Sequence, residues 1–132
     1  MSDTIVARSV ESRAEVESLD ALHAERRALL PEYTKLRAIY GPFGTADARR
    51  KAMVSVVAIR VRRDLLAKNE KVTEAYLDAA AHADEQYQRH LDERDAGAAR
   101  YLELDTTVTE IEERIRSRET ELNCYRAEIG LR

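Results

Sequence analysis

Apolar residues recur at helical spacing along almost the whole chain. In residues 3–40 they stand mostly three or four positions apart, at Val16, Leu19, Leu22, Leu29, Tyr33, Leu36 and Tyr40. Positions three and four apart share one face of an α-helix, so this spacing predicts a helix over residues 3–40. Pro31 interrupts the pattern without shifting its register. We therefore expect a helix kinked at Pro31, or a second helix that begins there.

A turn and a second helix follow. In "YGPFGT", residues 40–45, the Gly41-Pro42 pair ends the first helix and Thr45 is a candidate N-cap for the next. The stretch "MVSVVAIRVRR" is rich in β-branched residues and alternates like a strand near its end, which leaves a strand open. No partner strand exists elsewhere and both flanks favour helix. We predict a helix over 46–68, apolar around much of its circumference and largely covered by other elements.

Two more helices complete the prediction. Asn69 and Lys71 indicate a turn, Thr73 can cap a short helix over 73–82, and Asp84 can cap a long helix over 84–128. Gly97 stands inside the long helix, where glycine costs about 1 kcal/mol relative to alanine. Roughly 45 helical residues span about 65 Å, which exceeds the diameter of a compact domain of this size. An elongated molecule is therefore expected.

The long helix carries a narrow apolar stripe. Two series of side chains repeat every seven residues, with Arg118 as the one polar member: Tyr101, Val108, Ile115, Leu122 and Ile129 in one, and Leu104, Ile111 and Tyr125 in the other. A strict heptad of this kind is typical of a coiled-coil seam. Its partner is the first helix folding back antiparallel, or another copy of the chain. The predicted fold class is all-α, an elongated helical hairpin or coiled coil forming one domain over residues 1–132.

Composition supports this interpretation and adds an expectation of self-association. Ala, Glu, Lys, Leu and Arg make up just over half of the 132 residues, as in long helices. One narrow seam buries little apolar surface for a chain of this length, and pairing two copies would bury more, so we expect a homo-oligomer. The single cysteine, Cys124, excludes an intrachain disulfide. No signal peptide or membrane-length apolar run is present, which favours a cytoplasmic protein without a membrane partner.

No pattern of catalytic or ligand-binding residues emerges. The sequence contains no glycine-rich phosphate-binding loop and no serine or histidine in a nucleophile pattern. Asp20 and His23 share a helix face, but the second pair that a di-iron site needs is missing. We therefore expect no enzyme activity, no metal and no cofactor.

One segment is distinctly basic. Residues 46–71 contain eight basic side chains and three acidic ones. Such a helix can bind nucleic-acid phosphates, and the candidate contacts are Arg49, Arg50, Lys51, Arg60, Arg62 and Arg63. The alternative is that these side chains pair with acidic residues of the third helix or cover apolar surface with their stems.

The layout also resembles a known class of proteins. A leading helix, the stretch "KVTEAYLDAAAHADEQYQRHLDE" and a long heptad helix ending in "IRSRETELNCYRAE" are similar to small coiled-coil accessory proteins of phages and prophages, over residues 45–128. Genes for such proteins lie near replication and single-strand annealing recombination genes. The resemblance implies a phage origin and an accessory, non-catalytic role in the cytoplasm of a bacterial host. With the heptad and the absence of a catalytic site, it leads us to expect an adaptor that self-associates, or an inhibitor of a host or defence enzyme. The basic segment gives the alternative of a recombination accessory that touches DNA. It assigns no functional residues.

Overall fold

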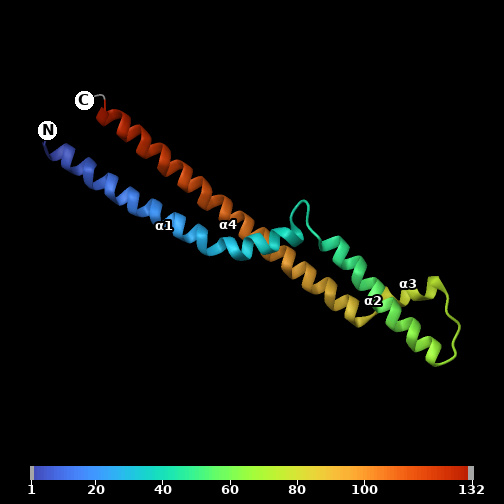
Figure 1. The fold of residues 1–132 in the computed structure, drawn as a ribbon. Helices are drawn as coiled ribbons and strands as arrows, with labels where there is room; N and C mark the ends of the chain where they lie inside the picture. Colours follow the sequence, from blue (N-terminus) through green and yellow to red (C-terminus); the bar gives the residue numbers. More distant parts are fainter. Residues whose placement is uncertain (1, 131–132) are drawn as a thin grey trace. The chain divides into compact units, whose positions relative to one another are not determined.

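Helices joined by short turns make up the part of the chain that the structure describes. The computed structural model describes the backbone of residues 2–130 and the side chains of residues 19–130. Its helices are α1 (Ser2–Tyr40), α2 (Ala46–Ala67), α3 (Glu74–Ala83) and α4 (Glu85–Gly130) (Figure 1). No strand occurs in residues 2–130, so the all-α prediction and the long C-terminal helix are confirmed.

Two ambiguities of the sequence are resolved by the helix bounds. Pro31 lies inside α1, which continues to Tyr40, so the alternative of a second helix beginning at Pro31 is wrong. The β-branched stretch of residues 53–63 lies within α2. Its valines do not pair as a strand, because Val57 packs into a core formed with the neighbouring helices.

Two compact units make up the chain, and α1 and α4 each contribute to both. Unit 1 contains Met1–Tyr33 and Glu103–Arg132, and unit 2 contains Thr34–Leu102.

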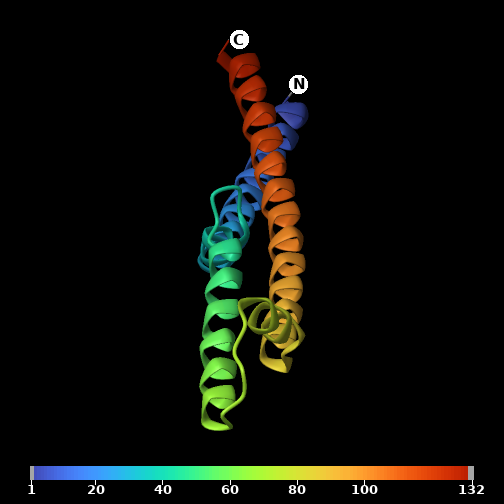
Figure 2. The same ribbon diagram turned by 90° about the vertical axis from the view of Figure 1, so that its right-hand side faces the viewer.

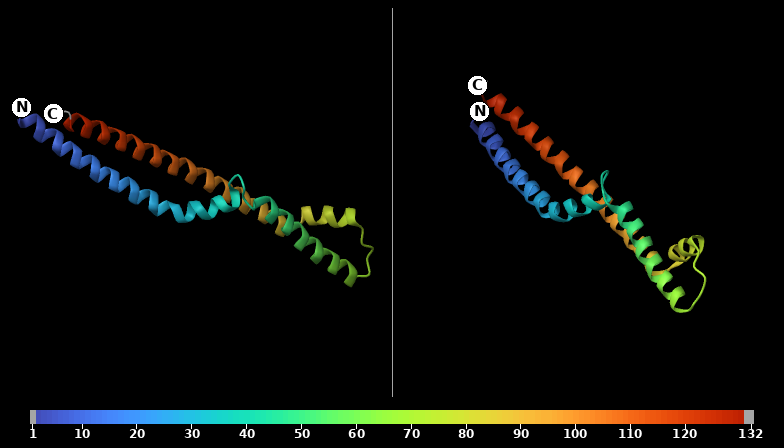
Figure 3. Two further views of the ribbon diagram at one scale, coloured as in Figure 1. Left: turned by 45° about the horizontal axis from the view of Figure 1, so that its top comes forward. Right: turned by 45° about the vertical axis from the view of Figure 1, so that its right-hand side comes forward.

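In unit 1, α1 and α4 lie side by side and run in opposite directions (Figure 2 and Figure 3). The Arg26 Nε atom donates to Glu112 Oε1 at 3.1 Å, and the Tyr33 hydroxyl donates to Asp105 Oδ1 at 2.7 Å. The second contact lies one heptad later in α1 and one heptad earlier in α4. These polar pairs therefore follow the same repeat as the apolar seam.

The seam of α4 is the core of unit 1. Its five buried residues are between 2% and 8% exposed, and they are Leu104, Val108, Ile111, Ile115 and Leu122. The described part of α1 carries half-buried side chains at matching steps of three and four, including Leu19, Leu22, Leu29 and Tyr33. A narrow stripe needs only one neighbouring helix to cover it, and α1 supplies that helix.

Unit 2 has a small core to which three helices contribute. Val57 of α2 and Ala81 of α3 are fully buried, and Tyr87 of α4 is 4% exposed. Met53, Val54, Ala58, Val61 and Leu91 pack around them. Because α3 has only ten residues, it covers one side of α2 and leaves the rest to α4 or to solvent.

Local signals position these helices. Asn69 adopts a positive φ of 54° after α2, a left-handed conformation that asparagine tolerates. Thr73 caps α3 by accepting a hydrogen bond from the Tyr76 backbone N–H at 3.2 Å. Asp84 precedes α4 and accepts from the Gln86 backbone N–H at 2.8 Å. Thr45 stands at the predicted N-cap position of α2, but its hydroxyl makes no capping bond and accepts instead from Arg49 Nε at 3.2 Å.

Gly97 has a packing role that its sequence position does not reveal. A Cβ added to Gly97 would overlap the ring and hydroxyl of Tyr40, so the tyrosine lies directly against the glycine backbone. Both residues belong to unit 2. The missing side chain is thus what allows the end of α1 to approach α4 within this unit.

We expect Gly97→Ala to destabilise the protein, although alanine usually stabilises a helix interior relative to glycine by about 1 kcal/mol. The overlap with Tyr40 should outweigh that gain and lower the free energy of unfolding by about 1–3 kcal/mol. Thermal melts followed by circular dichroism measure the effect. Gly130→Ala is the control, because an added Cβ there meets no atom within 4 Å. A stabilised Gly97→Ala variant, or an equal loss in a Tyr40→Ala background, would contradict the contact.

The seam gives a second prediction. Ile115 is 8% exposed and Glu113 is exposed. Ile115→Asp buries an unpaired carboxylate, which costs several kcal/mol and approaches the whole stability of a small domain. Glu113→Ala should cost only a few tenths of a kcal/mol. Circular dichroism at 222 nm during heating should show a lost or strongly lowered transition for the aspartate variant alone. Equal, small effects from both substitutions would show that the stripe is not a core.

Candidate interaction surfaces

The eight predicted seam residues do not form one exposed surface. Five are buried in unit 1, Tyr101 and Tyr125 are half-buried, and Ile129 is 53% exposed. Arg118, the polar member of the heptad, is half-buried, and its Nη1 atom lies 3.7 Å from Oε2 of Glu121 in the same helix. Within unit 1, α1 thus occupies the position that a second copy would need. Of the eight predicted seam residues, Ile129 is the exposed one, near the end of α4.

Shallow grooves flank the seam, but their linings do not define a ligand site. One of them, about 620 Å³, is lined by Leu22 and by six polar side chains of α4, namely Glu110, Glu113, Arg114, Ser117, Arg118 and Glu121. Four of these six are exposed glutamates or an exposed arginine that solvent already hydrates. The groove therefore offers mixed surface charge with little apolar lining.

The Asp20–His23 pair does not extend into a metal site. His23 is half-buried and lines a second groove with Arg26 and Glu112. Among the described residues, no group of three or more histidine, cysteine, aspartate or glutamate side chains is close enough to hold a metal ion. Likewise, no helix in the described range is long and apolar enough to cross a lipid bilayer.

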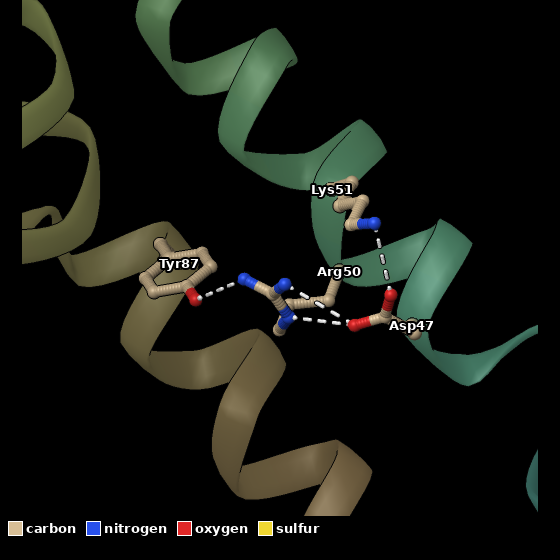
Figure 4. A network of polar contacts seen from close by, with 4 residues as sticks. All are labelled: Asp47, Arg50, Lys51 and Tyr87. Carbon is tan, nitrogen blue, oxygen red and sulfur yellow. Dashed lines mark hydrogen bonds and ion pairs between the residues drawn. The ribbon is translucent and has the colours of Figure 1, made fainter.

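Two of the six candidate phosphate-binding residues are engaged with one carboxylate of α2 (Figure 4). Arg50 lies 3.1 Å and Lys51 lies 3.2 Å from the two carboxylate oxygens of Asp47. The hydrogen bond from Lys51, followed by that from Arg50, lowers the pKa of Asp47 below its ordinary value. Both cations therefore have an acidic partner within their own helix.

Arg50 also links α2 to α4. Its guanidinium donates to the Tyr87 hydroxyl at 3.5 Å, and the tyrosine ring belongs to the core of unit 2 (Figure 4). The hydrogen bond to Tyr87, and then the one to Asp47, raises the pKa of Arg50. Arg50 is thus a structural residue that satisfies the polar end of a buried tyrosine.

Arg60 is neutralised from another element. Its guanidinium contacts Asp84 Oδ2 at 2.5 Å, at the junction between α3 and α4. The hydrogen bond from Arg60, with a further one from the Gln86 backbone N–H, lowers the pKa of Asp84. Asp84 therefore caps a helix and pairs with a cation through the same carboxylate.

The remaining three arginines have no carboxylate partner among the residues that the structure describes. Arg62 and Arg63 are exposed and form no hydrogen bond or ion pair with any residue that the structure describes. Arg49 is exposed, and its Nε atom donates to the hydroxyl of Thr45 at 3.2 Å. The structure thus separates the basic segment into side chains that hold unit 2 together and side chains that are left to solvent.

An exposed apolar stripe on α2 was not predicted from the sequence. Val56 is 53%, Ile59 is 60% and Leu66 is 59% exposed. The expectation that α2 would be largely covered is wrong, because the short α3 and the start of α4 cover only the side that carries Val57 and Leu65. The spacing signal was present: Ala52, Val56, Ile59, Arg63 and Leu66 stand at steps of four and three. We refer to these five residues as the outer face of α2.

Comparison of the chain with protein-family models, with curated protein sequences and with solved structures found no match.

The Asp84 cap generates a pH prediction. A carboxylate whose pKa is lowered in the folded state stabilises the fold above its ordinary pKa of 3.8 and loses this contribution as the pH falls below that value. Asp84→Asn should therefore lower the melting temperature at pH 7, and the difference from the unsubstituted protein should shrink below about pH 3.8. Asp92→Asn is the control, because Asp92 is an exposed carboxylate of the same helix. A difference that persists unchanged at pH 2.5 would rule out the charged carboxylate as its cause.

Proposed function

We propose that this chain is a non-catalytic protein–protein interaction module, an adaptor that contacts its partner through the outer face of α2. The observation that carries the proposal is the exposure of Val56, Ile59 and Leu66 along one side of a helix whose other side is packed into the core of unit 2. Scattered exposed apolar residues are ordinary, whereas several aligned on one helix face are typical of a binding surface.

The hydrophobic effect favours burial of these side chains by a partner. Apolar surface removed from water contributes roughly 25 cal/mol per Å². A partner that buries these three half-exposed branched side chains would therefore gain binding free energy that the isolated chain does not gain on folding. No described helix covers them, and their substitution by polar residues would leave the core intact. A surface of this kind is explained by a partner that buries it.

Self-association through the long helix is a separate part of the proposal, and its available surface is limited. The buried seam residues are already covered in unit 1, so a second copy would have to use the end of α4 near Tyr125 and Ile129 or displace α1. A phage-type accessory role is supported only by the resemblance of the sequence layout. An inhibitor of a host or defence enzyme would use the same kind of exposed surface.

Nucleic-acid binding is the second candidate function, and Arg49, Arg62 and Arg63 favour it because they are exposed and meet no carboxylate in the described part of the chain. Fluorescence anisotropy with single- and double-stranded oligonucleotides tests it. If the arginines contact phosphates, the affinity for the oligonucleotides should fall steeply as salt is raised. It should also drop when Arg62 and Arg63 are replaced by glutamate. Absence of binding at low salt would remove this candidate.

The adaptor proposal is tested by photo-crosslinking. A benzophenone amino acid at position 59 should form a covalent adduct with a protein in an extract of the cell that produces the chain. The same probe at position 113, on the exposed side of α4, is the control. Leu66→Asp should abolish the adduct from position 59 without lowering the melting temperature by more than a few degrees, because Leu66 is exposed. Equal labelling from positions 59 and 113, or no protein adduct at position 59, would argue against this surface.

A further inference from the structure

We infer that the partner of the outer face of α2 is an amphipathic helix whose apolar stripe is flanked by carboxylates. This inference rests on the proposed function and specifies the chemistry of the partner. Its three supports are the shape of the stripe, the sign of the charges around it and the position of Arg63 within it.

The stripe has the dimensions of a helix-binding surface. Ala52, Val56, Ile59, Arg63 and Leu66 follow steps of four and three, the same repeat that the α4 seam uses to pack against α1. From Ala52 to Leu66 the stripe runs about 21 Å along α2 at 1.5 Å per residue. A single partner helix of about four turns would cover it, as in other complexes where a helix presents residues at steps of three and four.

The unpaired charges on this side of α2 have one sign. The helical repeat places Arg49 and Arg62 on opposite flanks of the stripe and Arg63 within it. The carboxylates of α2 lie elsewhere: Asp47 is paired with Arg50 and Lys51, and Asp64 falls on the side of Val57 and Val61. A partner with flanking glutamates or aspartates would therefore meet cations along both edges, which favours its association and fixes its register.

Arg63 distinguishes this occupant from three others. In a membrane, a stripe with Arg63 between Ile59 and Leu66 would place a guanidinium at the depth of its apolar neighbours, which is costly. With a second copy of the chain, both outer faces would carry positive charge, and Arg63 would meet no carboxylate. With nucleic acid, Val56, Ile59 and Leu66 would have no apolar partner, since phosphate contact needs only the charges. A carboxylate of a partner helix opposite Arg63 satisfies the arginine while its apolar neighbours are buried.

Three synthetic peptides test the inference. Each is an alanine-rich helix of about 21 residues with the same leucine stripe, and the flanking positions are all glutamate, all glutamine or all lysine. Fluorescence anisotropy with the full chain should show that the glutamate peptide binds at least tenfold more tightly than the glutamine peptide and that the lysine peptide binds most weakly. The preference for the glutamate peptide should decrease as salt is raised.

Substitutions in the chain sharpen the test. The double variant Arg62→Glu, Arg63→Glu should reverse the order, so that the lysine peptide binds most tightly. Ile59→Asp should weaken binding of all three peptides at least tenfold. Arg114→Glu is the matched control, since it reverses an exposed arginine of α4, and it should leave the order unchanged.

Four results would overturn the inference: equal affinity for the three peptides, preference of the unsubstituted chain for lysine, no binding of any peptide, or a control variant that reverses the order like the α2 variant. Binding of anionic vesicles or oligonucleotides that needs Arg62 and Arg63 but tolerates Ile59→Asp would assign the surface to lipid or nucleic acid. If sedimentation shows that the chain self-associates and that Ile59→Asp abolishes this, the outer face of α2 binds a second copy of the chain. If the peptides give one of the four contradicting results but the photo-crosslinker at position 59 still forms a protein adduct, the adaptor function stands. In that case only the proposal of an acidic partner helix is wrong.

Discussion

The burial of the α4 stripe against α1 in unit 1 is the contact on which the packing of this unit depends. A stripe of heptad-spaced residues such as Val108, Ile111 and Ile115 is too narrow for a multi-layered core, and one helix is enough to cover it. The contacts of Arg26 with Glu112 and of Tyr33 with Asp105 repeat at the same interval. Apolar and polar contacts therefore specify one alignment of the two helices together, and the fold uses the seam that would otherwise be available for assembly.

Unit 2 is organised by a different constraint, the shortness of α3. Ten residues cover one side of a 22-residue helix, and with the start of α4 they enclose Val57, Ala81 and Tyr87. The opposite side of α2 then carries Val56, Ile59 and Leu66 into solvent. Because the fold gains nothing from these three side chains, the surface most suited to a partner is on α2 and not on the long heptad helix.

The charges of α2 divide in the same way as its apolar residues. On the packed side, Arg50 joins Asp47 to the hydroxyl of Tyr87, and Arg60 joins Asp84 at the start of α4. On the outer side, Arg62 and Arg63 meet no carboxylate among the described residues. The net excess of basic residues in the segment thus combines arginines that cross-link the fold with arginines that are exposed on the outer side, where we propose that the partner binds.

The sequence by itself determined where the helices lie, which residues of α4 form a seam, and that Thr73 and Asp84 stand at helix starts, because periodicity and capping depend on residues only a few positions apart. It left open whether α1 or another copy faces the seam, and it misjudged how much of α2 is covered. It also gave no indication that Tyr40 packs on Gly97. These features were decided by the tertiary structure, because a helix with apolar residues on two sides has no local property that selects which side a distant segment will cover.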